Sequence, residues 1–268
     1  MQASNTSFAG SIPYTYDRYL GPMLFEPYAE DLVSRVDPSA ALHVLEIACG
    51  SGIVTQRLVK TLSPFSTLIA TDLNPDMLSV ARKRVPDQHL EWMAADALDL
   101  PFPDSSFDLV VCQFGFMFMP DKARAFAEVC RVLQPGGRLL FNTWDKLANN
   151  PVFDLAHSIV ANFFPDNPPQ FYQVPFSFYD EQLIHELLNA AGFRNSRIHL
   201  LQKESLSPSA ADAARGVVEG NPILTFIQQR DASMTDLLRD EVEHALSARF
   251  GNRPMKAPMQ AWVGETRK

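Results

Sequence analysis

The spacing of small residues in one short loop is the feature of this sequence that could carry chemistry. An apolar run over residues 43–47 contains a single acid, Glu46, and Ala48, Gly50 and Gly52 follow it. Small residues leave the backbone open, so a ligand can lie directly against such a loop. A carboxylate just before the loop would repel a pyrophosphate and would attract a cation. We therefore expect a positively charged ligand here.

Further side chains that could bind a ligand follow other apolar runs, where predicted strands end. Asp72 follows the second run, and its carboxylate can accept hydrogen bonds from both hydroxyls of a ribose. Asp96 and Ala97 follow the third run. An acid there could accept a hydrogen bond from the adenine amine, while backbone groups bind the edge of the ring. Gln113 ends the fourth. Ligands of open α/β sheets bind beyond the carboxyl ends of the strands, so this ordered set predicts an adenosine site.

The glycine spacing differs from the patterns that bind phosphorylated adenosine ligands. The dinucleotide fingerprint requires Gly-x-Gly-x-x-Gly, but its third glycine would fall at Thr55 and its first position is Ala48. The Walker A ending, Gly-Lys-Ser/Thr, does not occur in this loop. The loop thus favours a cationic adenosine ligand, and an NAD-dependent oxidoreductase is the disfavoured alternative.

Short apolar runs alternate with helical patterns from residue 43 to residue 144, and this alternation positions the loops. Helices are expected over 53–62, after an N-cap at Asn74 and after an N-cap at Asp121, with Pro135-Gly136-Gly137 ending the last one. The expected strands cover residues 43–47, 67–71, 89–93, 107–113 and 138–143. Strand–helix alternation of this kind predicts a doubly wound α/β fold, with helices on both faces of a parallel sheet.

The alternation breaks after Trp144. We expect a helix over 180–191, strands over 193–200 and 260–263, and two or three helices between Ser207 and Phe250, broken at residues 220–222. The predicted organisation is an N-terminal helical cap or lid (1–36) and one main domain (37–268), which carries an inserted lid at about 145–180 and a helical insertion at about 207–250.

Composition and charge narrow the class of protein. The net charge is −8, which argues against nucleic acid as the main partner. The three cysteines have no Cys-x-x-Cys spacing and the six histidines no metal-ligand spacing, so we expect neither a disulfide framework nor a metal site. The first ten residues do not resemble a secretory signal, and no apolar run is long enough for a membrane span. We therefore expect a cytoplasmic protein.

Four stretches occur in a characteristic order: residues 44–52, Asp72, residues 96–110, and residues 133–139 with the pattern Leu-x-Pro-Gly-Gly. Together they resemble the motifs of class I S-adenosylmethionine-dependent methyltransferases, and the closest branch is type 11, which includes the ubiquinone/menaquinone C-methyltransferases. The resemblance implies a mostly parallel, seven-stranded, Rossmann-like sheet with an N-terminal helical cap and helical insertions.

The resemblance also implies which residues contact the cofactor S-adenosylmethionine. Glu46 would hold its amino group, and Asp72 its ribose hydroxyls. The residues at the methionine part would be Glu46, Ala48, Gly50, Gly52 and Gln113, and those around the adenosine would be Asp72, Leu73, Met77, Asp96 and Ala97.

Aromatic residues lie where a methyl acceptor would bind. Phe116 and Phe118 follow the fourth strand, and Tyr14 and Tyr19 belong to an N-terminal segment that could close over the site. The ring of Tyr19 could contact a sulfonium. Packing inside the protein is the alternative for each of these side chains. No catalytic residue is assigned, although His157 would be a candidate base if it faces the site.

We expect an enzyme that moves a methyl group from S-adenosylmethionine to a small, fairly apolar acceptor by in-line transfer, as a monomer or homodimer. Since this cofactor is already activated, catalysis would come mostly from positioning and the exclusion of water. The main alternative is a non-catalytic module that binds S-adenosylmethionine as a sensor. N-, O- and C-acceptors are all compatible with these residues.

Overall fold

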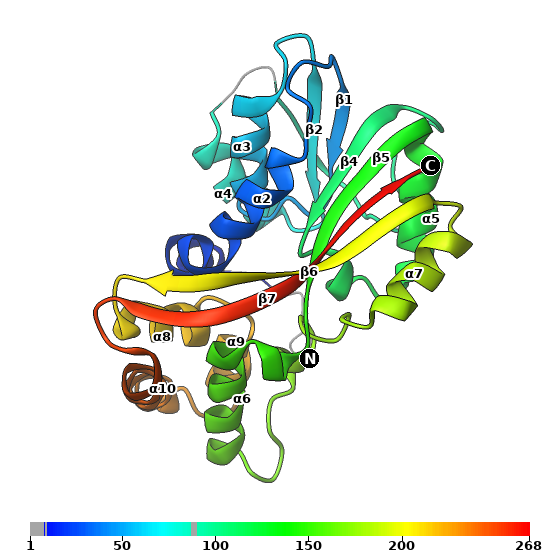
Figure 1. The fold of residues 1–268 in the computed structure, drawn as a ribbon. Coiled ribbons are helices and arrows are strands. Elements are labelled where there is room, and N and C mark those ends of the chain that lie inside the picture. Colours follow the sequence, from blue (N-terminus) through cyan, green and yellow to red (C-terminus); the bar gives the residue numbers. More distant parts are fainter. Residues whose placement is uncertain (1–7, 9, 87–89) are drawn as a thin grey trace. The chain divides into compact units, whose positions relative to one another are not determined.

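The computed structural model describes residues 8, 10–86 and 90–268, and its strands form one sheet with the order β3-β2-β1-β4-β5-β7-β6 (Figure 1). β1 pairs in parallel with β2 and β4, β2 with β3, and β4 with β5, whereas β7 runs antiparallel to β5. The predicted doubly wound, mostly parallel, seven-stranded α/β fold is confirmed. The strands are β1 (His43–Glu46), β2 (Thr67–Asp72), β3 (Glu91–Ala94), β4 (Phe107–Gln113), β5 (Leu133–Trp144), β6 (Arg194–Ser207) and β7 (Met255–Arg267).

The chain divides into two compact units. The sheet unit consists of residues 28–144, 178–201 and 261–268, and the helical unit consists of residues up to Pro27 together with 145–177 and 202–260. β6 and β7 continue along the chain from one unit into the other, and both strands are much longer than the sequence pattern predicted. The roles of cap and lid given above to parts of the helical unit stay predictions.

Helices flank the sheet unit on both sides. Apart from α2 (Glu26–Ser34), which begins at the unit boundary, they are α3 (Ile53–Thr61), α4 (Pro75–Arg84), α5 (Lys122–Val132) and α7 (Glu181–Ala190), with the short η2 (Phe116–Phe118) before α5. Figure 1 shows α3 and α4 on one side of the sheet and α5 and α7 on the other. The predicted caps are present, because the side chain of Asn74 accepts from the backbone N–H of Asp76 and that of Asp121 from Arg124.

Two predictions about the strands of this unit need correction. Pro135-Gly136-Gly137 does not end the helix before it, since α5 ends at Val132 and Leu133 already pairs with Phe107. The Pro-Gly-Gly turn lies instead in an irregular part of β5, where the register shifts and Gly136 has a φ of +81°. The third strand covers Glu91–Ala94 rather than 89–93, and His89 is outside the described residues.

The helical unit contains most of the remaining helices. The predicted break at residues 220–222 is confirmed, since it separates α8 from α9. α6 lies within the stretch that was predicted as an inserted lid, at about 145–180. The elements are α1 (Ile12–Thr15), the π-helix η1 (Tyr16–Phe25), η3 (Leu147–Asn149), α6 (Pro151–Phe163), η4 (Phe171–Gln173), α8 (Ala210–Glu219), α9 (Ile223–Asp231) and α10 (Met234–Phe250).

Neither a membrane-spanning helix nor a metal cluster occurs in the part of the chain that the structure describes. None of its helices has both the length and the apolar character that a bilayer crossing requires. Nor do three or more His, Cys, Asp or Glu side chains gather there in a way that could hold a metal ion.

Candidate cofactor site

The loop after β1 lies at the switch point of the sheet and exposes its backbone. The N–H of Ile47 donates to the carbonyl of Val111 in β4 at 3.0 Å, and the N–H of Cys49 donates to the carbonyl of Thr71 in β2 at 2.9 Å. Within this loop Ala48, Gly50 and Gly52 have φ values of +52°, +57° and +81°. A Cβ built on Gly50 would meet no described atom within 4 Å. The loop therefore offers open backbone beside the end of β1.

Asp72 connects this loop to the end of β2. Its Oδ2 accepts from the N–H of Gly50 at 2.8 Å, and its Oδ1 accepts from the N–H of Asn74 at 2.8 Å. Burial raises the pKa of Asp72, and the backbone N–H bonds partly offset that rise. Each carboxylate oxygen keeps acceptor capacity for a further donor, as the predicted contact with ribose hydroxyls requires. Sequence reasoning predicted Asp72 as a ligand contact, which stays a prediction, but missed that it holds the loop.

Glu46 is a buried acid at the end of β1. It is only 1% exposed, and burial raises its pKa from 4.5 to about 8; bonds from Thr55 lower the pKa and the nearby Asp72 raises it further. Among the described residues, its Oε2 has no hydrogen-bond partner. A buried carboxylate with a free oxygen beside a second acid is stabilised by a cation or a hydrogen-bond donor. The site is therefore suited to a positively charged ligand.

The predicted adenosine contacts lie at the same edge of the sheet. Leu73 is 66% exposed, while Met77 is buried on α4. The N–H of Ala95 donates to the carbonyl of Asp72 at 3.1 Å, which brings the segment after β3 next to the end of β2. The side chain of Asp96 is exposed there, and its neighbour Ala97 is half-buried. The structure thus brings these residues together with Asp72, and their contacts with adenine stay predictions.

The loop after β4 closes against the loop after β1. Gln113 is half-buried at the end of β4, and Phe114 has a φ of +50°, which is unusual for a residue with a side chain. A Cβ on Gly115 would lie 2.7 Å from the Cβ of Ala48 and 2.7 Å from the Sγ of Cys112. The two loops therefore approach so closely that this position requires glycine. Sequence reasoning did not single out Gly115, although it directly follows the Gln-Phe pair at the end of the strand.

Asn142 supports the conformation of the β4 loop. It is fully buried in β5, opposite Gln113, and its Oδ1 accepts from the N–H of Phe114 at 3.0 Å. Its Nδ2 is buried and makes no hydrogen bond within the described ranges. No motif pointed to Asn142, because its position depends on the pairing of β4 with β5.

The structure does not support Phe116 as a pocket residue. Its side chain has no exposed surface and its ring stacks on Phe126 with 4.2 Å between centroids, with Phe141 against its edge at 5.4 Å. Phe116 therefore belongs to the hydrophobic core. Phe118, which is half-buried, stays a candidate for the acceptor pocket.

Three other candidates, Tyr14, Tyr19 and His157, belong to the helical unit. Tyr14 is 63% exposed. The ring of Tyr19 has the guanidinium groups of Arg18 at 5.3 Å and Arg215 at 6.0 Å, and its contact with the sulfonium stays a prediction. His157 lies against the ring of Tyr172 at 6.3 Å, and its Nδ1 is buried with no hydrogen-bond partner in the described residues. Its role as a base stays a prediction.

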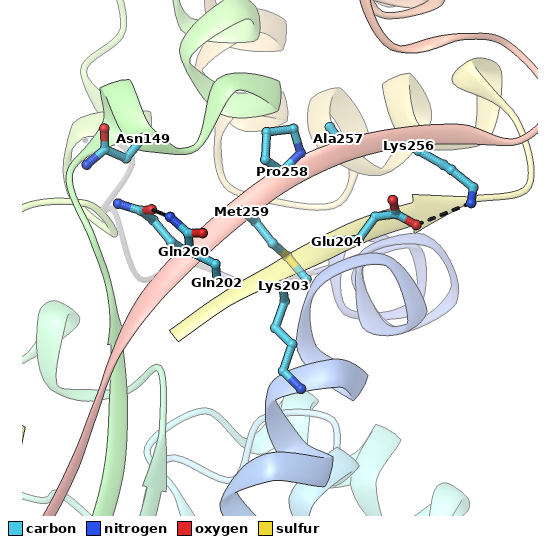
Figure 2. Close-up of a pocket in the computed structure, with 9 residues that line it drawn as sticks. All are labelled: Asn149, Gln202, Lys203, Glu204, Lys256, Ala257, Pro258, Met259 and Gln260. Atoms are coloured by element: carbon cyan, nitrogen blue, oxygen red, sulfur yellow. Dashed lines mark hydrogen bonds and ion pairs between the residues drawn. The ribbon is translucent and has the colours of Figure 1, made fainter. Parts of the chain in front are cut away.

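The helical unit also contains an open groove that no sequence motif indicated (Figure 2). It has a volume of about 450 Å³. At one end the side-chain amide of Gln202 donates to Gln260 at 3.0 Å, and at the other Lys256 pairs with Glu204 at 3.4 Å. Gln260 in turn donates to the buried carboxylate of Asp145. The lining residues are Asn149, Gln202, Lys203, Glu204, Lys256, Ala257, Pro258, Met259 and Gln260.

Comparison with known proteins identifies the family. Residues 45–141 match the family Methyltransf_11, which is described as a methyltransferase domain. The ubiquinone/menaquinone biosynthesis C-methyltransferase UbiE of Hahella chejuensis is 38% identical over 126 residues, which cover 46% of this chain and 50% of that protein. The UbiE protein of Saccharophagus degradans is 30% identical over 171 residues, which cover 58% of this chain and 68% of that protein. The chain thus spans about half the length of the first relative and two thirds of the second.

A solved structure shares the fold. The phosphoethanolamine N-methyltransferase 2 of Haemonchus contortus, in complex with phosphomonomethylethanolamine and S-adenosylhomocysteine, matches with a TM-score of 0.63 at 17% identity, covering 98% of this chain and 58% of that one. At this identity the likeness concerns the fold alone. The assignment to a family rests instead on the matched methyltransferase domain and on the sequence relatives. The chain belongs to the type 11 branch of the class I methyltransferase family, whose cofactor is S-adenosylmethionine.

Proposed function

We propose that this chain transfers a methyl group from S-adenosylmethionine to a small, fairly apolar acceptor. The observation that carries the proposal is the buried Glu46 carboxylate, whose Oε2 lacks a partner within the described residues beside a second acid, Asp72. The cofactor has an ammonium and a sulfonium group, and either charge is favourable next to these acids. The open side of Gly50 leaves room for it. The residues present therefore fit this cofactor.

The residues around the loop after β1 would bind and orient the cofactor. Glu46 would accept from the ammonium group, and its ionised form would then be stabilised by the cation. Asp72, already positioned by two backbone N–H groups, would accept from the ribose hydroxyls. Gly50 and Gly52, with Ala48, would let the backbone lie under the methionine part. The remaining predicted contacts are Leu73, Met77, Asp96, Ala97 and Gln113.

When bound, S-adenosylmethionine would supply an activated methyl group for in-line transfer to a nucleophilic atom of the acceptor, with the thioether as the leaving group. The contribution of the protein is to hold the acceptor on that line and to exclude water from it. A base is required only if the acceptor must lose a proton before it reacts. His157 remains the candidate for that role.

The acceptor we favour is an electron-rich ring of the quinol type. Two relatives are named as ubiquinone/menaquinone biosynthesis C-methyltransferases, and a quinol ring is a largely apolar, electron-rich acceptor. Phe118, which belongs to the sheet unit with the proposed cofactor residues, is the aromatic candidate for contacts with such a ring. We also propose that the protein is cytoplasmic, which is consistent with three cysteines that are all buried free thiols. We propose further that it is a monomer or a homodimer.

Two measurements test the proposal. Isothermal titration calorimetry should show binding of S-adenosylmethionine and S-adenosylhomocysteine and no binding of NAD; the reverse result would refute the cofactor assignment. Transfer of a labelled methyl group is then measured with a panel that begins with demethylated quinols and continues with small amines and phenols. Binding of the cofactor without turnover of any panel member would favour the sensor alternative.

A further inference from the structure

A polar stripe on α5 fixes the segment that follows β3. Arg124, Glu128 and Arg131 are spaced four and three residues apart, so they share one face of the helix. The Nε of Arg124 donates to the carbonyl of Leu98 at 2.6 Å, and the Oε2 of Glu128 accepts from the N–H of Leu100 at 2.8 Å. The helix thus provides hydrogen bonds to backbone groups of a segment that belongs to neither a helix nor a strand.

Arg131 donates hydrogen bonds to three residues of this segment. Its Nη2 donates to the carbonyl of Leu100 at 2.9 Å, and its Nη1 donates to the carbonyl of Phe102 at 2.7 Å and to Asp104 at 2.9 Å. Its Nε and Nη2 also donate to the two oxygens of Glu128, at 2.9 and 2.8 Å. A guanidinium can make these bonds at once because its five N–H donors form a rigid plane, which a lysine lacks.

The anchored segment directly continues from Asp96. The Oδ1 of Asp96 accepts from the N–H of Leu98 at 2.9 Å, and the N–H of Asp99 donates back to the carbonyl of Asp96 at 3.0 Å. Before this turn, Ala95 is bonded to the end of β2. After it, the carbonyl of Leu98 and both backbone groups of Leu100 are bonded to α5. The turn is therefore held from both sides, and Asp96 has little freedom to shift.

We propose that Arg131, supported by Glu128, is a positioning residue that sets the Asp96 carboxylate and thereby the selectivity of the site for the 6-amino group of adenine. This inference rests on the proposed function, since it assumes that the cofactor lies with its adenine edge at Asp96 and Ala97. Arg131 contacts no part of the cofactor in this arrangement. Its effect passes through the backbone of Leu98–Phe102.

The test compares two ligands that differ only at this edge of the purine, at position 6 and at the adjacent ring nitrogen, which carries a hydrogen only in the second ligand. S-adenosylhomocysteine carries the 6-amino group, and S-inosylhomocysteine carries a carbonyl that a carboxylate would repel. Dissociation constants for both are measured by calorimetry with the full chain and with Asp96→Asn, Arg131→Met and Arg131→Lys. Arg138→Met serves as the matched control, because Arg138 also makes an ion pair (with Glu265, at 2.8 Å) and a bond to a backbone carbonyl but lies away from this segment.

The unmodified chain should prefer S-adenosylhomocysteine by about tenfold or more, the effect of one hydrogen bond to a charged group. Asp96→Asn and Arg131→Met should both lose most of this preference, Arg131→Lys should recover little of it, and Arg138→Met should keep it. Hydrogen exchange should speed up at residues 98–102 in Arg131→Met. A general loss of stability would weaken both ligands equally and leave their ratio intact.

Each of the remaining outcomes would contradict either this inference or the proposed function. If Arg131→Met keeps the full preference, or weakens both ligands by the same factor, the positioning role is wrong. If the unmodified chain binds both ligands equally well, Asp96 does not recognise the 6-amino group. The inference then fails, while the proposed function stands. If the unmodified chain binds neither ligand, the proposed function itself fails.

Discussion

The Asp72 carboxylate accepts a hydrogen bond from the backbone N–H of Gly50 at 2.8 Å. This bond joins the acid at the end of β2 to the loop after β1, at a glycine whose φ of +57° few other residues adopt readily. The acid expected to bind a ribose therefore also maintains the shape of the surface on which the cofactor would lie. Ligand binding and loop conformation are coupled through one side chain.

Replacing Asp72 with alanine should weaken the binding of S-adenosylhomocysteine by roughly 1.5–3 kcal/mol, the value of a hydrogen bond to a charged group. Because the loop also loses its anchor, hydrogen exchange at the Gly50 amide should speed up. Calorimetry measures the affinity, and Asp76→Ala is the control, since Asp76 is an exposed acid in the first turn of α4. Unchanged affinity in Asp72→Ala would remove this residue from the site.

The contact between Gly115 and Ala48 predicts a strong coupling between two small residues. Gly115→Ala should destabilise the chain by about 1–3 kcal/mol and reduce cofactor affinity, because its Cβ would lie 2.7 Å from that of Ala48. Ala48→Gly removes that neighbour and relieves a left-handed backbone, so by itself it should change stability by less than about 1 kcal/mol.

Urea unfolding of the four members of this double-mutant cycle checks the coupling. The double variant should be more stable than the sum of the single effects predicts, although a clash with Cys112 remains. Strict additivity would show that the two loops do not touch through these atoms.

The sequence was sufficient to predict those features that depend only on residues close together in the chain. Asn74 and Asp121 could be predicted as caps because a cap depends only on residues two and three positions away. The strand over 107–113 was predicted correctly, since β4 is buried along most of its length and reads as an apolar run. Pro135-Gly136-Gly137 misled because proline and glycine can end a helix or interrupt a strand, and only the pairing of Leu133 with Phe107 decides between them.

The positions of several candidate site residues in the fold could be predicted, but the contacts between them could not. The order of strand ends placed Asp72 and Asp96 at one edge of the sheet, as the structure confirms. The partnerless oxygen of Glu46 and the support from Asn142 depend on side-chain packing between segments distant in sequence, which spacing does not report. Phe116 was assigned to a pocket because an aromatic after a strand end fits either a pocket or the core, and its contact with Phe126 decides for the core.

Phe116→Ala should therefore act on stability. Removing a fully buried aromatic ring leaves a cavity among Phe126 and Phe141, and a loss of about 3–5 kcal/mol in the free energy of unfolding is expected. Phe118→Ala, at the half-buried neighbour, provides the comparison and should cost much less. Urea unfolding checks both variants. A small effect of Phe116→Ala on stability, together with a raised KM for the acceptor, would return Phe116 to the pocket.

Glu46 predicts a pH dependence of stability in the ligand-free chain. Its pKa is about 8 in the folded state against 4.5 for an ordinary glutamate, so between these values the folded state binds more protons than the unfolded state. The free energy of unfolding should therefore fall as the pH rises from about 5 to 8, by an amount on the order of 4 kcal/mol, and then level off.

Glu46→Gln cannot ionise and should lack this component, so urea unfolding at each pH should show the unmodified chain losing stability relative to the variant. Saturating S-adenosylhomocysteine should shrink the difference, because its ammonium favours the ionised carboxylate. Parallel stability curves for the two chains would mean that Glu46 is ionised in the folded protein throughout this range.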